Sequence, residues 1–432
     1  MYDVLVIGGG MAGSIAALEA NRLGARVAVA SRSFGATALS TGAIDIAYTP
    51  ALSPAYQSPR TLAEHVMDIV AHRSAHPYAV LGVERTFSGL RGGYERLQEA
   101  CTSYGSAGAV TTIPELDMED ENQWLPSALG TLMPVARAYG AHIGLNLWEG
   151  GDVGILQFRG DAHFDAQAVQ RGITFDATSL GLSSPDFHRI EVTGAAHSPM
   201  AMARVFDDFA TVDRLIESLT PQCSGLRGLV VPPVFGLSRA ETVLRRLGDA
   251  LGMPVVEALS CIPSVPGVRL QRTLQTCLHA KAIDHLDEVI EPIIEGSTVK
   301  RVRTKKHGEV GAGAVILATG RFISGGIAWH QQCREALFDF PVSTEVGVLE
   351  DDSPHATLRE TPQESHPLMT AGLFVNKELQ PVYEGKLAYD NLYAAGMVIG
   401  GFASRYALCA DGVAVSTGCL AARAAVANVG RV

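Results

Sequence analysis

The sequence predicts an α/β fold in which a Rossmann-type, three-layer domain carries an inserted α/β domain. Three observations predict it. A glycine-rich turn near the N-terminus lies between an apolar strand-like run and an Ala-rich helical segment. Strand-like and helix-like patterns alternate through the middle of the chain, and two further strand–turn combinations follow toward the C-terminus. The 432 residues are too many for one compact core, so we expect more than one domain.

The N-terminal segment predicts one βαβ unit. We expect a strand over Asp3–Ile7, a helix over Ser14–Leu23 and a second buried strand over Ala25–Ala30. Gly24 closes the helix, as glycine commonly does just after a helix C-terminus. Rossmann-type sheets are built from such units.

A second series of elements occupies the middle of the chain. The predicted elements are strands over 153–158 and 228–234 and helices over 164–171, 200–219 and 239–251. Their alternation implies a largely parallel sheet covered by helices. Clusters of Pro, Ser and Gly at 50–59 and 262–267 mark the expected boundaries. We therefore expect residues 1–110 and 262–432 to form one discontinuous domain and residues 111–261 to form the insert.

The C-terminal part contains two more strand–turn units. A helix is expected over Leu270–Ala282, and the charged stretch Lys300–Glu309 predicts a solvent-exposed hairpin. The hairpin leads into Gly313–Gly320, which predicts a buried strand that ends in a turn. A strand over Leu392–Ala395 and a small-residue helix over Gly412–Asn428 follow, with a glycine turn after the strand.

The composition excludes several classes of protein. Apolar residues make up 47% and charged residues 18% of the chain, which rules out global disorder. The 34 basic and 45 acidic residues give a net charge of −11, which argues against a nucleic-acid partner. Seven scattered cysteines never form a C-x-x-C pair, so neither a disulfide framework nor a metal site is indicated, and a reducing compartment is expected.

Gly8-x-Gly10-x-x-Gly13 is the most informative motif, because a predicted strand precedes it and a predicted helix follows. Gly8 permits the tight turn, Gly10 lets a phosphate approach the backbone amides, and Gly13 lets helix and strand pack closely. The helix N-terminus adds partial positive charge. The motif therefore predicts a bound phosphate group at this turn.

The acid that usually completes this motif is absent. An Asp or Glu about 20 residues on, at the end of the second strand, normally binds an adenosine ribose, whereas here Ser31 and Arg32 follow the strand. Either Ser31 alone holds the ribose, or no adenosine is present, as with a mononucleotide flavin. In a third interpretation Arg32 faces the 2′-phosphate of NADP, and in a fourth it is a solvated surface charge.

A run of small and hydroxyl residues follows the second strand and includes Ser40, Thr41 and Gly42. Such a segment can lie against a flat ring and its ribityl chain, because nothing bulky intervenes and its hydroxyls and amides donate hydrogen bonds. On the sequence alone a plain polar loop explains it equally well.

Turns in the second half of the chain favour the flavin. The residues at these turns are Gly320, Gly396, Gly401, Asp411 and Gly412. The last two open the final helix, whose N-terminus can point at an electron-rich part of a cofactor. Together with the N-terminal motif, these turns predict a flavoprotein of the FAD/NAD(P)-binding type.

Short motifs along the rest of the chain carry a resemblance to a known family. In chain order they are Gly8–Gly13, Ser40–Asp45, His76–Tyr78, Leu129–Thr131, Pro263–Ser264, Gly267–Gln271, Leu317–Gly320, Ser324–Gly326, Asn391–Leu392 and Gly400–Phe402. With them the chain resembles the B-subunit family of anaerobic glycerol-3-phosphate dehydrogenases, itself similar to the larger group of fumarate-reductase-like flavoproteins. The Arg269 segment and the Ser324–Gly326 turn are the more specific motifs, and residues 110–260 match least.

The resemblance implies a subunit of a complex that oxidises sn-glycerol 3-phosphate, a small phosphorylated polyol, to dihydroxyacetone phosphate and passes electrons toward quinone. The implied partners are a flavin-bearing A subunit and an iron–sulfur C subunit at the membrane. They imply a cytoplasmic chain that is peripheral on the inner face of the cell membrane. The implied cofactor is FMN, with FAD as the alternative. One departure is Asp411, which stands where the family tends to have glycine and would place a negative charge near a reduced flavin.

Alcohol oxidation by a flavin needs a hydride acceptor, a base, and cations for a substrate phosphate. Arg269 and Arg272 lie three residues apart at a helix start, so they can share a face and hold an anion, although two surface arginines would give the same pattern. None of the 13 histidines has a spacing that identifies it as the base, so no catalytic residue is named.

Other functions stay open on the sequence alone. Substrate can be oxidised wholly on the A subunit, with this chain relaying electrons. The chain can instead be a cofactor-free scaffold that docks the A and C partners, or an NADP-linked reductase that uses Arg32.

Overall fold

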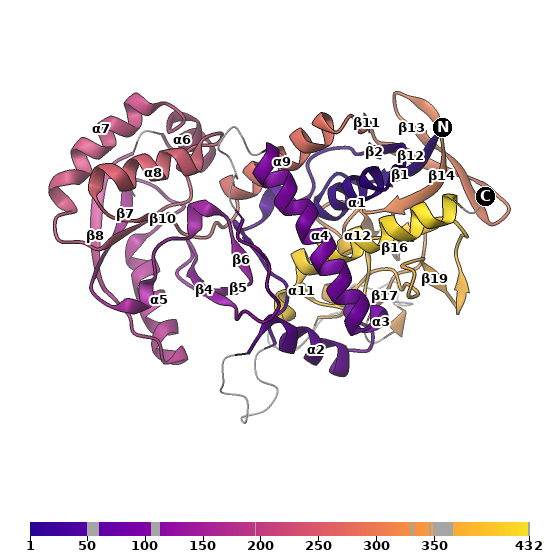
Figure 1. Ribbon diagram of the computed structural model, residues 1–432, viewed down its shortest axis with the longest axis horizontal. Coiled ribbons are helices and arrows are strands. Elements are labelled where there is room, and N and C mark those ends of the chain that lie inside the picture. The colour runs from indigo at the N-terminus through magenta and orange to yellow at the C-terminus, as the bar shows by residue number, and fades with distance from the viewer. Residues whose placement is uncertain are drawn as a thin grey trace.

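The computed structural model describes residues 1–49, 60–104, 113–194, 196–329, 332–344, 347–348 and 366–430. Figure 1 shows two sheets, each with its own helices, toward opposite ends of the long axis. The smaller sheet uses strands from residues 152 to 257, and the larger sheet uses strands from both sides of that stretch. The cluster at 50–59 and the expected domain limit at 110 lie outside the described residues, and the limits of the insert stay a prediction.

The larger sheet has a parallel core. In spatial order its strands are β11 (Asp284–Leu286), β2 (Val27–Ala30), β1 (Tyr2–Ile7), β14 (Gly308–Leu317) and β21 (Leu392–Ala394). Val6 lies opposite Val29 on one side and Ile316 on the other, and all three side chains are buried. Strands covered on both faces read as continuous apolar runs, which is why the sequence predicted them. The Rossmann-type fold is thereby confirmed.

The first half of β14 belongs to an antiparallel hairpin. β12 (Val289–Glu295) pairs with β13 (Thr298–Thr304), and β13 pairs with β14 from Arg301 opposite Gly311 to Thr304 opposite Gly308. The predicted exposed hairpin is confirmed. β14 is thus shared between the parallel core and the hairpin, and these two parts with the helices below make up the predicted three layers.

A group of helices covers the parallel core. It consists of α1 (Met11–Arg22), α4 (Val83–Tyr104), α9 (Val265–Ala280) and α12 (Ala410–Val429). Glycine allows the close approach: a Cβ on Gly93 of α4 would lie 2.1 Å from the Val415 carbonyl oxygen of α12. Among the described helices α12 alone is long and apolar enough to cross a membrane, but 67% of its most apolar window is buried in this packing.

The smaller sheet is entirely parallel, as predicted. Its order is β10 (Val255–Glu257), β9 (Gly228–Val231), β7 (Asp152–Arg159) and β8 (Asp186–Thr193), covered by α5 (Ala166–Leu180), α6 (Pro199–Val205), α7 (Phe209–Leu219) and α8 (Ala240–Leu251). The single helix predicted over 200–219 is two helices, because the Asp208 side chain caps α7 by accepting hydrogen bonds from the amides of Ala210 and Thr211.

Short elements connect the two sheets and border the larger one. They are η1 (Ala36–Leu39), β3 (Ala43–Ile44), α2 (Leu62–His72), α3 (Pro77–Leu81), β4 (Gln123–Pro126), β5 (Leu132–Val135), β6 (Arg137–Ala138), η2 (Gly140–His142), η3 (Leu147–Glu149), η4 (Thr220–Gln222), β15 (Ile327–Trp329), β16 (Cys333–Glu335), β17 (Ser343–Thr344), β18 (Gly347–Val348), α10 (Pro367–Thr370), β19 (Val382–Tyr383), β20 (Lys386–Leu387), η6 (Gly396–Val398) and α11 (Ser404–Ala407). Of these, β3 and β6 pair and carry the chain from the larger sheet toward the smaller one.

A buried ion pair joins α9 to the smaller sheet. Arg269 of α9 donates from Nη1 and Nη2 to the two carboxylate oxygens of Glu257 in β10, at 2.5 and 2.9 Å. Its Nε donates to the Gly236 carbonyl oxygen at 2.7 Å, and both side chains are fully buried. Bidentate geometry, with Nε also donating to a protein oxygen, is what such a pair needs to offset the desolvation of both charges.

We expect Arg269→Met to destabilise the protein by about 3–5 kcal/mol, because Glu257 is left buried without its partner. Arg272→Met, three residues along the same helix and exposed, should change stability by less than about 0.5 kcal/mol. Urea unfolding of both variants measures the difference. Equal midpoints would contradict the structural role of the pair, and adding Glu257→Leu to Arg269→Met should restore much of the loss.

Candidate functional site

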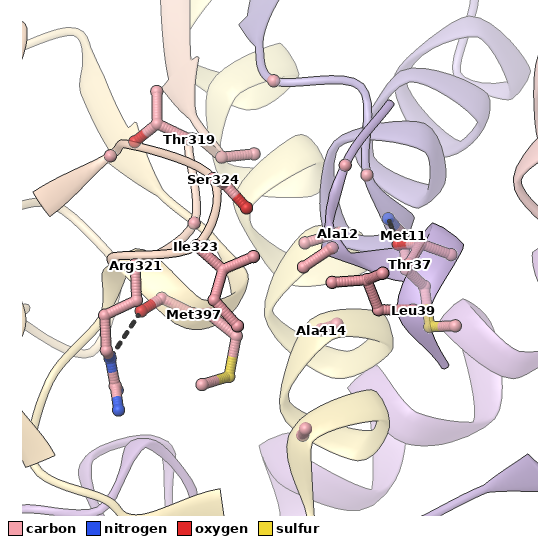
Figure 2. A pocket seen from close by; sticks show the side chains of 18 of the residues that line it. Met11, Ala12, Thr37, Leu39, Thr319, Arg321, Ile323, Ser324, Met397 and Ala414 are labelled. Atoms are coloured by element: carbon pink, nitrogen blue, oxygen red, sulfur yellow. Dashed lines mark hydrogen bonds between the residues drawn. The ribbon is translucent and has the colours of Figure 1, made fainter. Parts of the chain in front are cut away.

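A cavity of about 1040 Å³ lies at the carboxyl ends of β1, β2 and β14. This is the edge of a parallel sheet at which ligands bind in open α/β folds, and the volume is at the upper end of the range for ligand cavities. Figure 2 shows Thr319, Arg321, Ile323 and Ser324 on one side of it, Met11, Ala12, Thr37 and Leu39 on the other, and Ala414 of α12 between them.

The glycine turn forms one edge of the cavity. Gly8 has φ +120°, and a Cβ there would lie 2.1 Å from the Ala318 carbonyl oxygen at the end of β14. A Cβ on Gly13 would lie 1.9 Å from the Gly8 carbonyl oxygen. Gly10 differs, because the atom nearest to a Cβ added there would be Thr37 Oγ1, at 3.4 Å. Gly10 itself lines the cavity. Gly8 and Gly13 thus serve backbone packing, whereas Gly10 keeps the cavity clear.

Polar atoms around the cavity lack partners, which makes the site suitable for a polar ligand. The hydroxyl oxygens of Ser40 and Thr319 are buried without a hydrogen bond in the described part of the chain. The amides of Gly9 and Gly10 likewise donate to no atom of the described residues. A phosphate at the turn and a hydroxylated chain beside Ser40 would satisfy these groups, so the residues present fit a nucleotide-type cofactor.

The structure brings many of the predicted cofactor residues to this cavity. Those that line it are Gly8, Gly10, Ser31, Arg32, Ser40, Thr41, Gly320 and Asp411. Five predicted residues do not line it, namely Gly13, Gly42, Gly396, Gly401 and Gly412. Each of the five permits a close contact instead; a Cβ on Gly42 would lie 2.3 Å from His142 Nε2, and one on Gly412 2.2 Å from Tyr78 Oη. Which lining residues contact a cofactor stays a prediction.

The expectation that Arg269 and Arg272 hold a substrate phosphate needs correction. Neither lines the cavity. Arg269 is buried and its charge is matched by Glu257, while Arg272 is exposed. The two therefore do not share a face, and Nε, Nη1 and Nη2 of Arg269 each bond to a protein oxygen.

Asp45 and Asp411 form a carboxyl pair in the cavity wall. The Asp411 amide donates to Asp45 Oδ1 at 2.7 Å, and the Asp45 amide donates to Asp411 Oδ2 at 3.4 Å. Neither forms an ion pair with any lysine or arginine that the structure describes. Burial raises the pKa of Asp45 to about 6, and burial together with the charge of Asp45 raises the pKa of Asp411 well above its usual value. The pair therefore retains a proton to higher pH than two exposed carboxyls would.

Arg321 supplies positive charge near the same end of the cavity. Its guanidinium donates to the carbonyl oxygens of Met369, Met397, Ile399 and Phe402 and lies over the Phe402 ring. Within the described residues no carboxylate pairs with it. Burial lowers the pKa of Arg321 to about 10, so it stays charged at neutral pH. Its donors are used by carbonyls, so its effect on a bound anion is through charge rather than direct hydrogen bonds.

The chain matches the family model described as FAD binding domain over residues 3–413. It belongs to the FAD-binding domain family. It is 23% identical to the B subunit of anaerobic glycerol-3-phosphate dehydrogenase from Actinobacillus pleuropneumoniae serotype 5b, covering 96% of this chain and 97% of that protein. It is 26% identical to the protein of the same name from Pectobacterium atrosepticum, covering 96% of each. Among solved structures, E. coli quinol fumarate reductase aligns with a TM-score of 0.43 and 10% identity, over 99% of this chain and 70% of that one.

These comparisons bear on three sequence-based expectations. The resemblance to the B-subunit family is confirmed by relatives of that name along nearly the whole chain. A flavin-dependent oxidoreductase class is likewise supported. FMN as the first choice of cofactor is not supported, because the family is defined by FAD binding.

Sequence reasoning about this FAD-binding domain missed three cavity residues. Asp45 stood within a recognised motif but had no visible partner, since Asp411 lies 366 residues away. Arg321 follows the predicted Gly320 turn directly, which was a usable signal. Glu288 follows β11, a strand of three residues that is too short to be predicted from periodicity.

We expect Gly10→Ala to fold normally and to bind flavin at least tenfold more weakly, because its Cβ fits the turn but occupies space where a phosphate approaches. Gly13→Ala is the matched comparison and should instead lower thermal stability, because its Cβ meets the Gly8 carbonyl oxygen. Thermal unfolding and flavin titration separate the two effects. Unchanged flavin affinity in Gly10→Ala would contradict a phosphate at this turn.

The carboxyl pair predicts a pH dependence of stability. Because the folded-state pKa of Asp45 is about 6, above the unfolded value of about 3.9, its contribution is fully present below about pH 4 and is lost as pH rises through 6. Between pH 4.5 and 7.5 the wild type should lose on the order of 2 kcal/mol of stability through this carboxyl. Asp45→Asn, which keeps an acceptor oxygen but cannot ionise, should not show this loss. Denaturation at both pH values measures it.

Asp208→Asn is the control for this experiment. The side-chain hydrogen bond from Thr211 lowers the pKa of Asp208, so its contribution is lost as pH falls rather than as it rises. The loss of stability above pH 4.5 should therefore persist in Asp208→Asn. A wild-type protein whose stability does not fall across this range would contradict the raised pKa of Asp45.

Proposed function

We propose that this chain is the flavoprotein B subunit of an anaerobic glycerol-3-phosphate dehydrogenase, that it binds FAD, and that the complex oxidises sn-glycerol 3-phosphate to dihydroxyacetone phosphate with electrons passing toward quinone. The observation that carries the proposal is the cavity between the glycine turn and the start of α12, with unpartnered hydroxyls of Ser40 and Thr319 in its surroundings. The names of the relatives along 96% of the chain supply the substrate.

Three regions of the cavity would hold different parts of FAD. The amides of the turn at Gly9 and Gly10 suit its phosphates, and the end of β2 suits its adenosine. The segment from Ser40 to Asp45 and the N-terminus of α12 suit the ribityl chain and ring. When bound, FAD supplies the hydride acceptor that alcohol oxidation requires. The protein's part is to bind it, to orient it and to place charge around it.

Charge near the α12 end of the cavity is compatible with an anionic substrate. Arg321 contributes a positive charge that no described carboxylate neutralises by an ion pair. The Asp45–Asp411 pair, whose pKa values are both raised by burial, is less negative than two ionised aspartates would be. Asp411 therefore repels a reduced flavin less than an ionised aspartate would, because a retained proton makes the pair less negative.

The partners and location of the protein follow the same proposal. The relatives are named as one lettered subunit of a dehydrogenase, which indicates a complex of several subunits. We propose that a flavin-bearing A subunit and an iron–sulfur C subunit accompany this chain, and that the C subunit holds it at the inner face of the cell membrane. The buried setting of α12 supports attachment through a partner rather than through that helix.

The NADP-linked alternative is the weaker one. Arg32 lines the cavity, but its Nη1 lies 3.7 Å from the Glu288 carboxylate. A 2′-phosphate placed there would face that negative charge, which is unfavourable. No observation favours the cofactor-free scaffold over a cofactor-binding chain, and the experiment below distinguishes them.

We expect the purified chain to be yellow and to release FAD when it is heated. Its absorption spectrum and the mass of the released chromophore test the proposal directly, with a Gly10→Ala sample as the matched control that should carry less flavin. Release of FMN would overturn the choice of FAD. A colourless protein that also fails to take up added flavin would overturn the redox assignment and leave the docking subunit as the better account.

A further inference from the structure

A carboxylate that accepts no hydrogen bond from any described residue lies in the corner of the cavity where the motif acid is absent. β11 runs parallel to β2, with Leu286 opposite Ala30, and the Ser31 amide donates to the Leu286 carbonyl oxygen at 3.1 Å. Counting on from that register, Glu288 lies level with Arg32, two residues past the last bridged pair. Both line the cavity. Glu288 therefore lies just past the end of the neighbouring strand, near the level at which the acid after β2 would stand.

The Glu288 carboxylate has unused hydrogen-bonding capacity. Its ion-pair partner is Arg32 at 3.7 Å, which is too long for a hydrogen bond, and no described residue donates a hydrogen bond to its side chain. The side chain is 36% exposed. The two other acids of this corner are engaged elsewhere: Asp284 accepts a hydrogen bond from Tyr2 Oη at 2.8 Å, and Asp287 pairs with His307 at 2.5 Å.

The Glu288 side chain is long enough to reach the space that an acid after β2 would fill. Neighbouring strands lie about 4.8 Å apart, and a glutamate side chain spans a similar length. A carboxylate that accepts hydrogen bonds from two adjacent hydroxyls makes charge-assisted bonds, which are stronger than bonds between neutral groups. Ser31 follows β2 directly and could also bind a hydroxyl, but its side chain is uncharged, unlike that of Glu288. Its Oγ lies 3.3 Å from His285 Nε2.

We propose that Glu288 binds the ribose hydroxyls of an adenosine diphosphate moiety and thereby selects a dinucleotide over a mononucleotide in this cavity. Where that dinucleotide is FAD, the inference rests on the proposed function; the recognition of adenosine diphosphate itself does not. The role of the acid that is absent after β2, an absence that suggested FMN, is then taken by an acid from the segment that follows β11.

A 2′-phosphate is the competing ligand for this corner. Lys305 also lines the cavity, and its backbone amide donates to the Glu288 carbonyl oxygen at 2.9 Å, so a second basic residue besides Arg32 borders this corner. The carboxylate of Glu288 decides between the two ligands, because it attracts hydroxyl donors and repels a phosphate. We therefore assign the corner to the ribose hydroxyls, and the test includes the phosphorylated ligand.

The test uses the full chain freed of its flavin. Affinities for FAD, FMN, ADP and 2′,5′-ADP are measured by fluorescence quenching and calorimetry in the wild type, Glu288→Gln and Glu291→Gln. Glu291 lies three residues further on, pairs with Arg303 on the surface of the hairpin and does not line the cavity, so it is the matched control. Thermal unfolding checks that all three proteins are folded.

We expect Glu288→Gln to weaken binding of FAD and ADP about ten- to a hundredfold and to leave FMN unchanged, because a charged acceptor to hydroxyls is lost. Glu291→Gln should match the wild type throughout. Equal weakening of FAD and FMN, unchanged ADP affinity, or tighter wild-type binding of 2′,5′-ADP than of ADP would each overturn the inference. A wild type that binds ADP but no flavin would overturn the proposed function while the ADP comparison still decides the role of Glu288.

Discussion

The Arg269–Glu257 pair is the interaction on which the placement of the cavity depends. It is buried between α9 and β10, so it fixes the smaller sheet against the helix. Two residues further along α9, Gln271 donates from Nε2 to the Gly9 carbonyl oxygen at 2.7 Å. One helix therefore holds the inserted sheet with one side chain and the glycine turn with another. A shift of α9 would move both, which ties the geometry of the cofactor turn to the packing of the insert.

The cavity itself results from backbone that approaches backbone. At Gly8 and Gly13 the contacts are too close for any side chain, so the turn, the end of β14 and the start of α1 form one compact edge. Such an edge presents amides and small hydroxyls rather than bulky groups. Charged side chains are added around this neutral frame, with Arg32 and Glu288 beside the end of β2 and Arg321 near the start of α12. The frame suits a long ligand whose parts differ in charge.

Much of the fold could be predicted from the sequence, because buried parallel strands and the glycine turn leave local signals. The site was harder to predict from the sequence, because it is formed by residues that lie far apart in the chain and meet only in the fold. An arginine at a helix start has the same local pattern whether it is buried, as Arg269 is, or exposed, as Arg272 is. Asp45 and Asp411 meet across 366 residues, and Glu288 borders the cavity from the segment just past β11. The helix over 200–219 was mispredicted because the cap at Asp208 breaks an otherwise continuous amphipathic pattern.

The position of α12 has a consequence for synthesis on the ribosome. Arg423 of α12 donates to Glu19 of α1, 404 residues earlier, and the Gly412 amide donates to the Asp45 carbonyl oxygen. The face of α1 that α12 covers is therefore left exposed while the intervening chain is made, and the cofactor cavity gains its last wall only when α12 emerges. Contacts so distant in sequence form slowly and leave apolar surface open meanwhile. A ligand that needs the whole cavity can then bind only after α12 has been made, because Ala410, Asp411 and Ala414 of that helix line it.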